Sequence, residues 1–212
     1  MFGEIFDVSS SQSAIWAVVL GALLATVGGF AATQMERVVE HRRRERNAAL
    51  FFGELLTTLQ IILRFAKSTH GRGDPFGPIT LRMLRSARKE IEIYDRNREQ
   101  LFDLHHAELR AQVQTLVIRL TMPLEGIFES TVEINAYQLQ LRTTAAGEEM
   151  RAELAARIAE LREQRDGGFE FIVEVMDELP SIIRDLQPLS GHAFRNVDEV
   201  VTRIGQPLAI SD

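Results

Sequence analysis

Residues 14–33 read AIWAVVLGALLATVGGFAAT, and this uncharged stretch decides how the rest of the chain is placed. No Asp, Glu, Lys, Arg or His occurs between Asp7 and Glu36. At about 1.5 Å rise per residue, a helix of this length spans about 30 Å, the thickness of the hydrocarbon core of a bilayer. We therefore predict a transmembrane helix over residues 13–35, preceded by a short extracytoplasmic tail at residues 1–12.

A cleaved signal peptide and a buried soluble helix are the two other structures that such a stretch can form. A signal peptide needs a cationic region before a shorter apolar stretch. Here Glu4 and Asp7 precede the stretch, and no Lys or Arg does. The pattern therefore favours a membrane helix that is retained.

Basic residues follow the span and none precedes it, which predicts its orientation. Cations close to a span stay on the cytoplasmic side of the membrane. We predict a single-pass protein of the inner (cytoplasmic) membrane with its N-terminus outside and its C-terminal part in the cytoplasm. The basic residues at the membrane surface are Arg37, Arg42, Arg43, Arg44 and Arg46.

The same basic cluster has a second interpretation, in which it binds anionic lipids. Arg82, Arg85 and Lys89 would then extend the cationic surface along the membrane, with each cation contributing about 1 kcal/mol near the surface. Glu36, Glu40 and Glu45 are interleaved with the arginines and dilute the cluster. The topology explanation is therefore favoured.

Small residues recur at every fourth position inside the span. On a helix this spacing forms one narrow face, which another membrane helix can approach closely. The sequence predicts a helix–helix interface there, with a homo-oligomer as one outcome. Its members are Ala17, Gly21, Ala25 and Gly29.

The rest of the chain has helical periodicity throughout. No Pro or Gly occurs at residues 31–52, so the membrane helix is expected to run on without a hinge. An apolar seam then follows the spacing of a helical bundle, and residues 68–78, with three Gly and two Pro, end the helix. The seam consists of Ala48, Phe52, Leu55, Leu59, Ile62 and Ala66.

Two further helices are expected before residue 143. The first begins near Ile79 and carries Leu84, Ala87, Ile91 and Tyr94 on one side. The second has a sustained heptad, which is typical of a coiled-coil seam, and Pro123 is expected to kink it. The heptad residues are Leu109, Val113, Leu116, Leu120, Ile127, Ile134, Tyr137 and Leu141.

A fourth helix is expected from Glu148, with Met150, Leu154, Ile158 and Leu161 on its apolar side. Gly167 and Gly168 should interrupt or bend it, after which a new stripe starts at Phe171 and Ile172. Residues 191–212 form an amphipathic C-terminal segment, in which Asn196 and Glu199 resemble a capping box.

No segment alternates with the period of a strand, so the fold class is all-α. Long helices joined by short turns pack antiparallel most economically. We predict an N-terminal transmembrane helix that continues into a cytoplasmic antiparallel helical bundle, residues 36–190.

Composition excludes several kinds of chemistry. The chain of 212 residues has no Cys, which rules out disulfides, thiolate metal sites and thiol nucleophiles. With 24 Lys and Arg against 30 Asp and Glu, a general nucleic-acid binder is disfavoured. Neither a phosphate-binding glycine loop nor a Gly-x-Ser-x-Gly elbow is present. We expect a protein that is not an enzyme and has no cofactor.

Possible metal ligands are few and poorly spaced. Asp103 and His106 share a helical face, but a di-iron bundle needs two Glu-x-x-His elements and two more Glu. Glu125, Glu129 and Glu133 form a row opposite the Ile127 seam, which predicts a solvated face or a docking surface for a cationic partner.

The order of these features resembles that of the many uncharacterised single-pass, membrane-anchored helical proteins of bacteria. The resemblance is carried by the short acidic tail, the span and residues 36–46, which read ERVVEHRRRER. It covers about the first 65 residues and implies no active site.

These features together predict a membrane-tethered, non-enzymatic interaction or scaffold protein, whose bundle docks partner proteins through helix–helix contacts. A second hypothesis is a small regulatory or accessory subunit of a larger membrane transporter or sensor complex. Co-purification in mild detergent distinguishes them, since the second requires a stoichiometric multi-span partner. A metal-dependent bundle is the third hypothesis.

Overall fold

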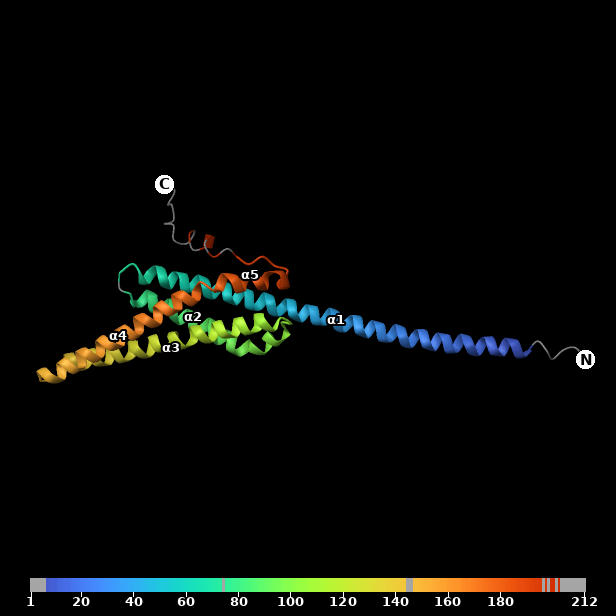
Figure 1. Ribbon diagram of the computed structural model, residues 1–212, viewed down its shortest axis with the longest axis horizontal. Coiled ribbons are helices and arrows are strands. Elements are labelled where there is room, and N and C mark those ends of the chain that lie inside the picture. The colour runs from blue at the N-terminus through green and yellow to red at the C-terminus, as the bar shows by residue number, and fades with distance from the viewer. Residues whose placement is uncertain are drawn as a thin grey trace, which may run out of the picture. The chain divides into compact units, whose positions relative to one another are not determined.

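The computed structural model describes residues 7–73, 75–143, 147–195, 197, 199, 200 and 202, with side chains from residue 19 onward. Across these residues the fold is all-helical and contains no strand, as predicted. The helices are α1 (Asp7–His70), α2 (Pro78–Asn97), the 3-10 helix η1 (Arg98–Asp103), α3 (Ala107–Thr143), α4 (Glu148–Met176) and α5 (Leu179–Ser190) (Figure 1).

The chain divides into two compact units, Met1–Arg44 and Glu45–Asp212. Helix α1 contributes to both and is helical throughout its length, as the lack of Pro and Gly at residues 31–52 predicts. The apolar seam that starts at Ala48 is part of the core of the second unit. Only the partly buried Ile62 of that seam is not fully enclosed.

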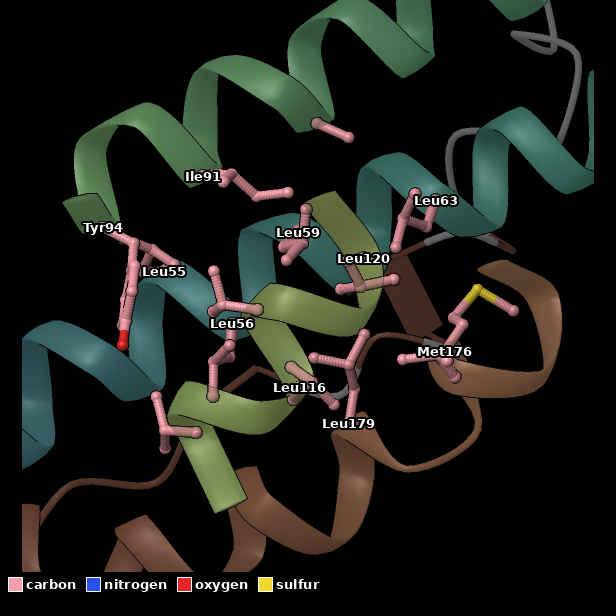
Figure 2. Packing of buried hydrophobic residues seen from close by; sticks show 14 of the residues in the cluster. Leu55, Leu56, Leu59, Leu63, Ile91, Tyr94, Leu116, Leu120, Met176 and Leu179 are labelled. Atoms are coloured by element: carbon pink, nitrogen blue, oxygen red, sulfur yellow. The ribbon is translucent and has the colours of Figure 1, made fainter. Parts of the chain in front are cut away.

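Helix α1 is buried on a wider face than the predicted seam. Leu56 and Leu63 are also enclosed, and so are the polar side chains of Thr57 and Gln60. The Thr57 hydroxyl donates to the carbonyl of Gly53 (2.7 Å), so its burial leaves no hydrogen-bonding group unsatisfied. Figure 2 shows this face of α1 in contact with side chains from several other helices. The contacting residues labelled there are Ile91, Tyr94, Leu116, Leu120, Met176 and Leu179.

Helix α2 begins where the glycine- and proline-rich turn predicts, with Gly77 at its N-cap and Pro78 at its first turn. Its apolar side is buried as expected, and Thr80 joins that side by a hydroxyl–hydroxyl bond to Thr69 (3.0 Å). The ring centroids of Tyr94 and Phe52 are 5.9 Å apart. These two contacts show that α2 runs antiparallel to the second half of α1.

The heptad of α3 is buried as predicted, and the helix continues through Pro123. Six of its eight members lie in the core, while Tyr137 and Leu141 pack in a smaller cluster with Ile134, Ile158 and Leu161. That cluster joins α3 to α4, which lie side by side in Figure 1. The two helices are antiparallel, because Ile134 meets Leu161 while Pro123 faces Gly168 further along.

Helix α4 corrects three expectations. It runs without interruption through Gly167 and Gly168, and the side chain that resumes the stripe is Phe169, which is 4% exposed. Phe171 is exposed instead, beneath the guanidinium of Arg119 (5.4 Å). Met150 is 46% exposed, because it lies in the first turn of α4, where α3 has already ended.

The predicted fourth helix is two helices, since α4 ends at Met176 and α5 starts at Leu179. Pro180 occupies the first turn of α5, where a missing N–H costs nothing, so it is compatible with the start of this helix. Gly191 ends α5 with a left-handed φ of 62°, and its N–H donates to the carbonyl of Gln187 (3.1 Å).

The start of the C-terminal segment packs against the second unit. Phe194 lies over Gly53 of α1, and Val197 is 7% exposed. Whether this segment packs on the bundle could not be decided from the sequence. Asn196 of the predicted capping box lies outside the described residues.

Candidate membrane segment and interaction surfaces

Helix α1, counted from Val19, is the one helix among the described residues that is long and apolar enough to cross a membrane. Length and composition alone do not distinguish a membrane helix from the core helix of a soluble protein, so the burial of each apolar stretch has to be compared. Helix α1 contains both kinds of apolar stretch. One face of residues 48–66 lies in the core, whereas no residue between 19 and 44 is buried.

Large apolar side chains in the first stretch are exposed without exception. Their exposed fractions run from 43% at Val19 to 73% at Met35. Two threonines in this stretch satisfy their hydroxyls within the helix, because Thr26 donates to the carbonyl of Ala22 (2.8 Å) and Thr33 to that of Gly29 (2.9 Å). The surface is therefore apolar and has no unsatisfied hydroxyl, which suits a helix in lipid.

The predicted small-residue face is open where the structure describes it. A Cβ added at Gly21 or Gly29 would meet no atom within 4 Å. Ala25 is exposed. The side chain of Ala17 lies outside the described ones. None of the described residues covers Gly21 or Gly29, and the pairing of this face with another helix stays a prediction.

The basic residues after the span differ in what they contact. Arg37, Arg42 and Arg43 are exposed. Arg44 bonds to Glu40 one helical turn away. Arg46 is held by the protein, since its Nε donates to the carbonyl of Ser190 (3.0 Å). Arg46 thus fastens α1 to the end of α5.

Glu45 makes a second such link, which we could not predict from the sequence. Its Oε1 accepts the backbone N–H of His105 (3.0 Å) and lies 3.1 Å from Nδ1 of the same residue. Glu45 and Arg46 therefore tie the first turn of the second unit to the start of α3 and the end of α5. Both links join residues more than 50 positions apart, so local sequence patterns contain no sign of them.

Arg82, Arg85 and Lys89 lie far from this first turn. The pairing of Thr80 with Thr69, and of Tyr94 with Phe52, places them beside the C-terminal half of the α1 core segment. At about 1.5 Å per residue, Lys89 and Arg82 lie about 18 to 30 Å along α1 from Arg46. Within the second unit these three residues therefore do not lie beside Arg46, and both interpretations of the basic cluster stay predictions.

The glutamate row on α3 is partly used inside the protein. Glu125 pairs with Arg88 of α2 (3.0 Å), and Glu133 lies 3.9 Å from Arg157 of α4. Glu129 between them is exposed. The row thus links neighbouring helices and is less free for a cationic partner than the sequence suggests.

An exposed apolar patch surrounds η1 and was missed in the sequence. Phe102 (80% exposed), Ile118 (52%) and Met122 (73%) line one cavity of about 290 Å³ between the end of α2, η1 and α3. Buried Leu101 and Leu104 flank Phe102, so its outward direction is held by the core. The sequence does contain one indication of this patch, because Ile118 and Met122 are apolar residues that lie outside the α3 heptad.

His70 lies in an aromatic cluster that joins the end of α1 to α4. Its ring stacks on Phe169 (centroids 4.0 Å apart, planes at 12°), and Phe76 meets it edge-on. Burial lowers the pKa of His70 below its ordinary value of 6.5, and Arg165 acts in the same direction, while Asp166 and Glu170 oppose them. Its Nε2 is buried without a hydrogen-bond partner among the described residues.

We expect acid to destabilise this cluster. Because the pKa of His70 is lower in the folded state, the unfolded chain binds more protons as the pH falls below about 6.5, and stability decreases. His70→Phe keeps the stacked ring and removes the titration. The thermal midpoint of the wild type should therefore fall by a few degrees more than that of the variant between about pH 7.5 and 5.5. Equal losses in the two proteins would contradict this.

No group of three or more His, Asp and Glu among the described residues is arranged to hold a metal ion. No family model, curated protein or solved structure matches the chain. The geometry therefore has to support any functional conclusion by itself. Its main features are an exposed apolar helix in the first unit and a helical second unit with open surfaces.

Proposed function

We propose that the chain is a single-pass membrane protein whose cytoplasmic helical unit docks partner proteins. In this proposal residues 13–35 lie in lipid, and residues from Glu45 onward form the docking unit. The observation that carries the proposal is the contrast within α1. Every large apolar side chain from Val19 to Val39 is exposed, whereas from Ala48 onward most apolar side chains of α1 are buried.

Energetics supports the membrane placement. Burying one large aliphatic or aromatic side chain is worth about 1.5–3 kcal/mol. The exposed set in α1 includes Leu20, Leu23, Leu24, Val27 and Phe30, and nothing among the described residues covers them. A bilayer would cover all of them together, and the helix satisfies its own backbone hydrogen bonds inside lipid.

Basic residues support the orientation and the tether. Exposed arginines follow the span, and positive charge is retained on the cytoplasmic side. Anchoring confines the helical unit to a surface, so that contacts with other proteins at the same membrane form at a raised effective concentration. The apolar patch of Phe102, Ile118 and Met122 is the kind of exposed surface that interaction sites have.

Single cysteines test the topology, because the chain has none of its own. We expect Ser10→Cys to react with a membrane-impermeant maleimide in intact cells, and Ala152→Cys to react only after the cells are permeabilised. Ala152 is exposed on α4, so its protection would come from the membrane and not from the fold. Labelling of position 152 in intact cells would refute the proposed orientation.

A further inference from the structure

An apolar groove runs between the first part of the α1 core segment and the last part of α2. Leu50 and Phe51 of α1 and Ile93 of α2 line it. Leu50 is 36% exposed and Ile93 39%, while Phe51 is half-buried and its ring meets Phe52 edge-on. The groove therefore presents apolar side chains on a rigid base that the core supports.

Two carboxylates border the groove from opposite helices, Glu54 on α1 and Glu90 on α2. Among the described residues Glu54 has one ionic contact, a long one to His192 (3.8 Å), and about half of its side chain is exposed. Glu90 is half-buried and has no hydrogen bond or ion pair with any described residue. Burial raises the pKa of Glu90 above its ordinary value.

The basic residues beside Glu90 in sequence do not compensate it. Arg88 bonds to Glu125 (3.0 Å) and also approaches Glu92 (3.8 Å). Lys89 has no ion pair with Glu90. A partly desolvated carboxylate without a partner is costly, and a cation supplied from outside would relieve that cost.

We propose that this groove binds a cationic amphipathic helix of a partner protein. The apolar face of that helix would lie on Leu50, Phe51 and Ile93, and its Lys or Arg side chains would pair with Glu54 and Glu90. This is the helix-in-groove mode of recognition, with charge complementarity selecting the partner. The inference rests on the proposed docking function and specifies the partner's chemistry.

Charge also argues against the other occupants. A second copy that docked groove to groove would bring the same two carboxylates together, and like charges facing each other disfavour this pairing. An anionic lipid headgroup or a nucleic-acid phosphate would be repelled in the same way. A cationic amphipathic helix would bury apolar surface on the base of the groove and form ion pairs at its acidic border.

The test uses the full-length chain in a non-ionic detergent and two synthetic helices of equal length. Both carry leucines at i, i+3, i+4 and i+7, flanked by lysines in one peptide and by glutamates in the other. We expect fluorescence anisotropy to show binding of the lysine peptide and not of the glutamate peptide. Glu90→Gln should weaken binding of the lysine peptide about threefold to tenfold. Glu90→Lys, which leaves Glu54 as the one acidic group among the described residues that line the groove, should abolish the preference for the lysine peptide.

Glu129 provides the matched control, since it is an exposed glutamate on α3 outside the groove. Glu129→Lys changes the net charge of the protein equally and should leave the preference for the lysine peptide intact. Equal effects of Glu90→Lys and Glu129→Lys, or no binding of the lysine peptide, would overturn the inference. The inference would also be overturned if the wild type self-associated and Glu90→Lys changed the extent of that self-association.

Failure of this experiment is distinguishable from failure of the proposed membrane topology. Peptide binding is measured on the extracted protein, whereas cysteine labelling is measured in cells. Circular dichroism of each variant shows whether the helical unit is still folded. If a folded Glu90→Lys variant kept the wild-type preference for the lysine peptide, the proposed binding site in the groove would be refuted. The proposed membrane anchor would not be affected by that result.

Discussion

Arginine at both Leu20 and Leu24 is expected to release the full-length chain from membranes. The two side chains are 60% and 66% exposed and lie one helical turn apart in the predicted span. An arginine near the centre of a membrane helix costs about 2.5–3.5 kcal/mol on insertion scales. Two of them cost about 5–7 kcal/mol, which is enough to reverse the insertion of a helix as rich in Ala and Gly as this one.

Ultracentrifugation without detergent measures the outcome. The wild type should be recovered in the membrane pellet, and most of the Leu20→Arg/Leu24→Arg chain should be in the supernatant. Ile79→Arg is the matched control, because Ile79 is 63% exposed on α2 and lies outside the span. If the double variant stayed in the pellet, or if Ile79→Arg also left it, the membrane assignment would be wrong.

Periodicity identified the helices wherever one apolar stripe dominates. The α3 heptad is the clearest case, because a seven-residue repeat specifies which side chains share a face regardless of what packs against them. The same holds for α2, whose buried side chains follow the expected stripe. In both helices most of the expected core residues are buried, and Thr80 of α2 and Val117, Leu124 and Ser130 of α3 are buried in addition.

The burial of α1 could be predicted only in part. Its second buried stripe includes Thr57 and Gln60, and polar residues of these types are mostly exposed in proteins. They are enclosed because α1 is surrounded by several helices, a fact of tertiary arrangement. Thr57 satisfies its hydroxyl on the preceding turn, which removes the cost of its burial.

The error in α4 has a simple physical origin. Two glycines cost a helix about 1 kcal/mol each relative to alanine, and tertiary contacts readily exceed that. The stripe of Leu154, Ile158 and Leu161 continues with unchanged phase to Phe169 and Ile172. An interruption at the two glycines, as expected from the sequence, would start a new apolar stripe at Phe171. Phe171 lies about 200° around the helix from Phe169, which is the buried residue.

The contacts that define surfaces were beyond the sequence. Glu45 with His105, and Arg46 with Ser190, depend on how whole helices are placed. The groove between α1 and α2 has the same character, since Glu54 and Glu90 belong to different helices and become neighbours of one surface only after packing. Sequence patterns predicted the apolar span and the basic residues after it, whereas the candidate docking surfaces follow from the packing of the helices.

Alanine at Gly53 is expected to detach the C-terminal segment from the helical unit. A Cβ at this position would lie 2.0 Å from Cζ of Phe194, which is closer than any real contact. Because that atom is the end of a side chain on a terminal segment, the ring should move away and α1 should stay in place. Losing about 1.5 kcal/mol of Phe194 burial would raise the population of the detached segment about tenfold.

Trypsin cleavage after Arg195, which is exposed, reports that population. We expect cleavage in Gly53→Ala to be up to about tenfold faster than in the wild type, provided that opening is fast relative to cleavage. Gly126→Ala is the control, because a Cβ there would meet no atom within 4 Å. Gly53→Ala and Gly126→Ala each stabilise their helix by up to about 1 kcal/mol through helix propensity. This gain would offset the loss of Phe194 burial in Gly53→Ala, so the thermal midpoint alone would not reveal that loss.

Phe194→Ala completes the argument, because it removes the ring without changing α1. If Gly53 acts by providing room for that ring, Phe194→Ala should accelerate cleavage as Gly53→Ala does, and the double variant should be no faster than Phe194→Ala alone. Additive acceleration would mean that the alanine perturbs α1 itself. Unchanged cleavage in Gly53→Ala would mean that Phe194 does not need the space that glycine leaves.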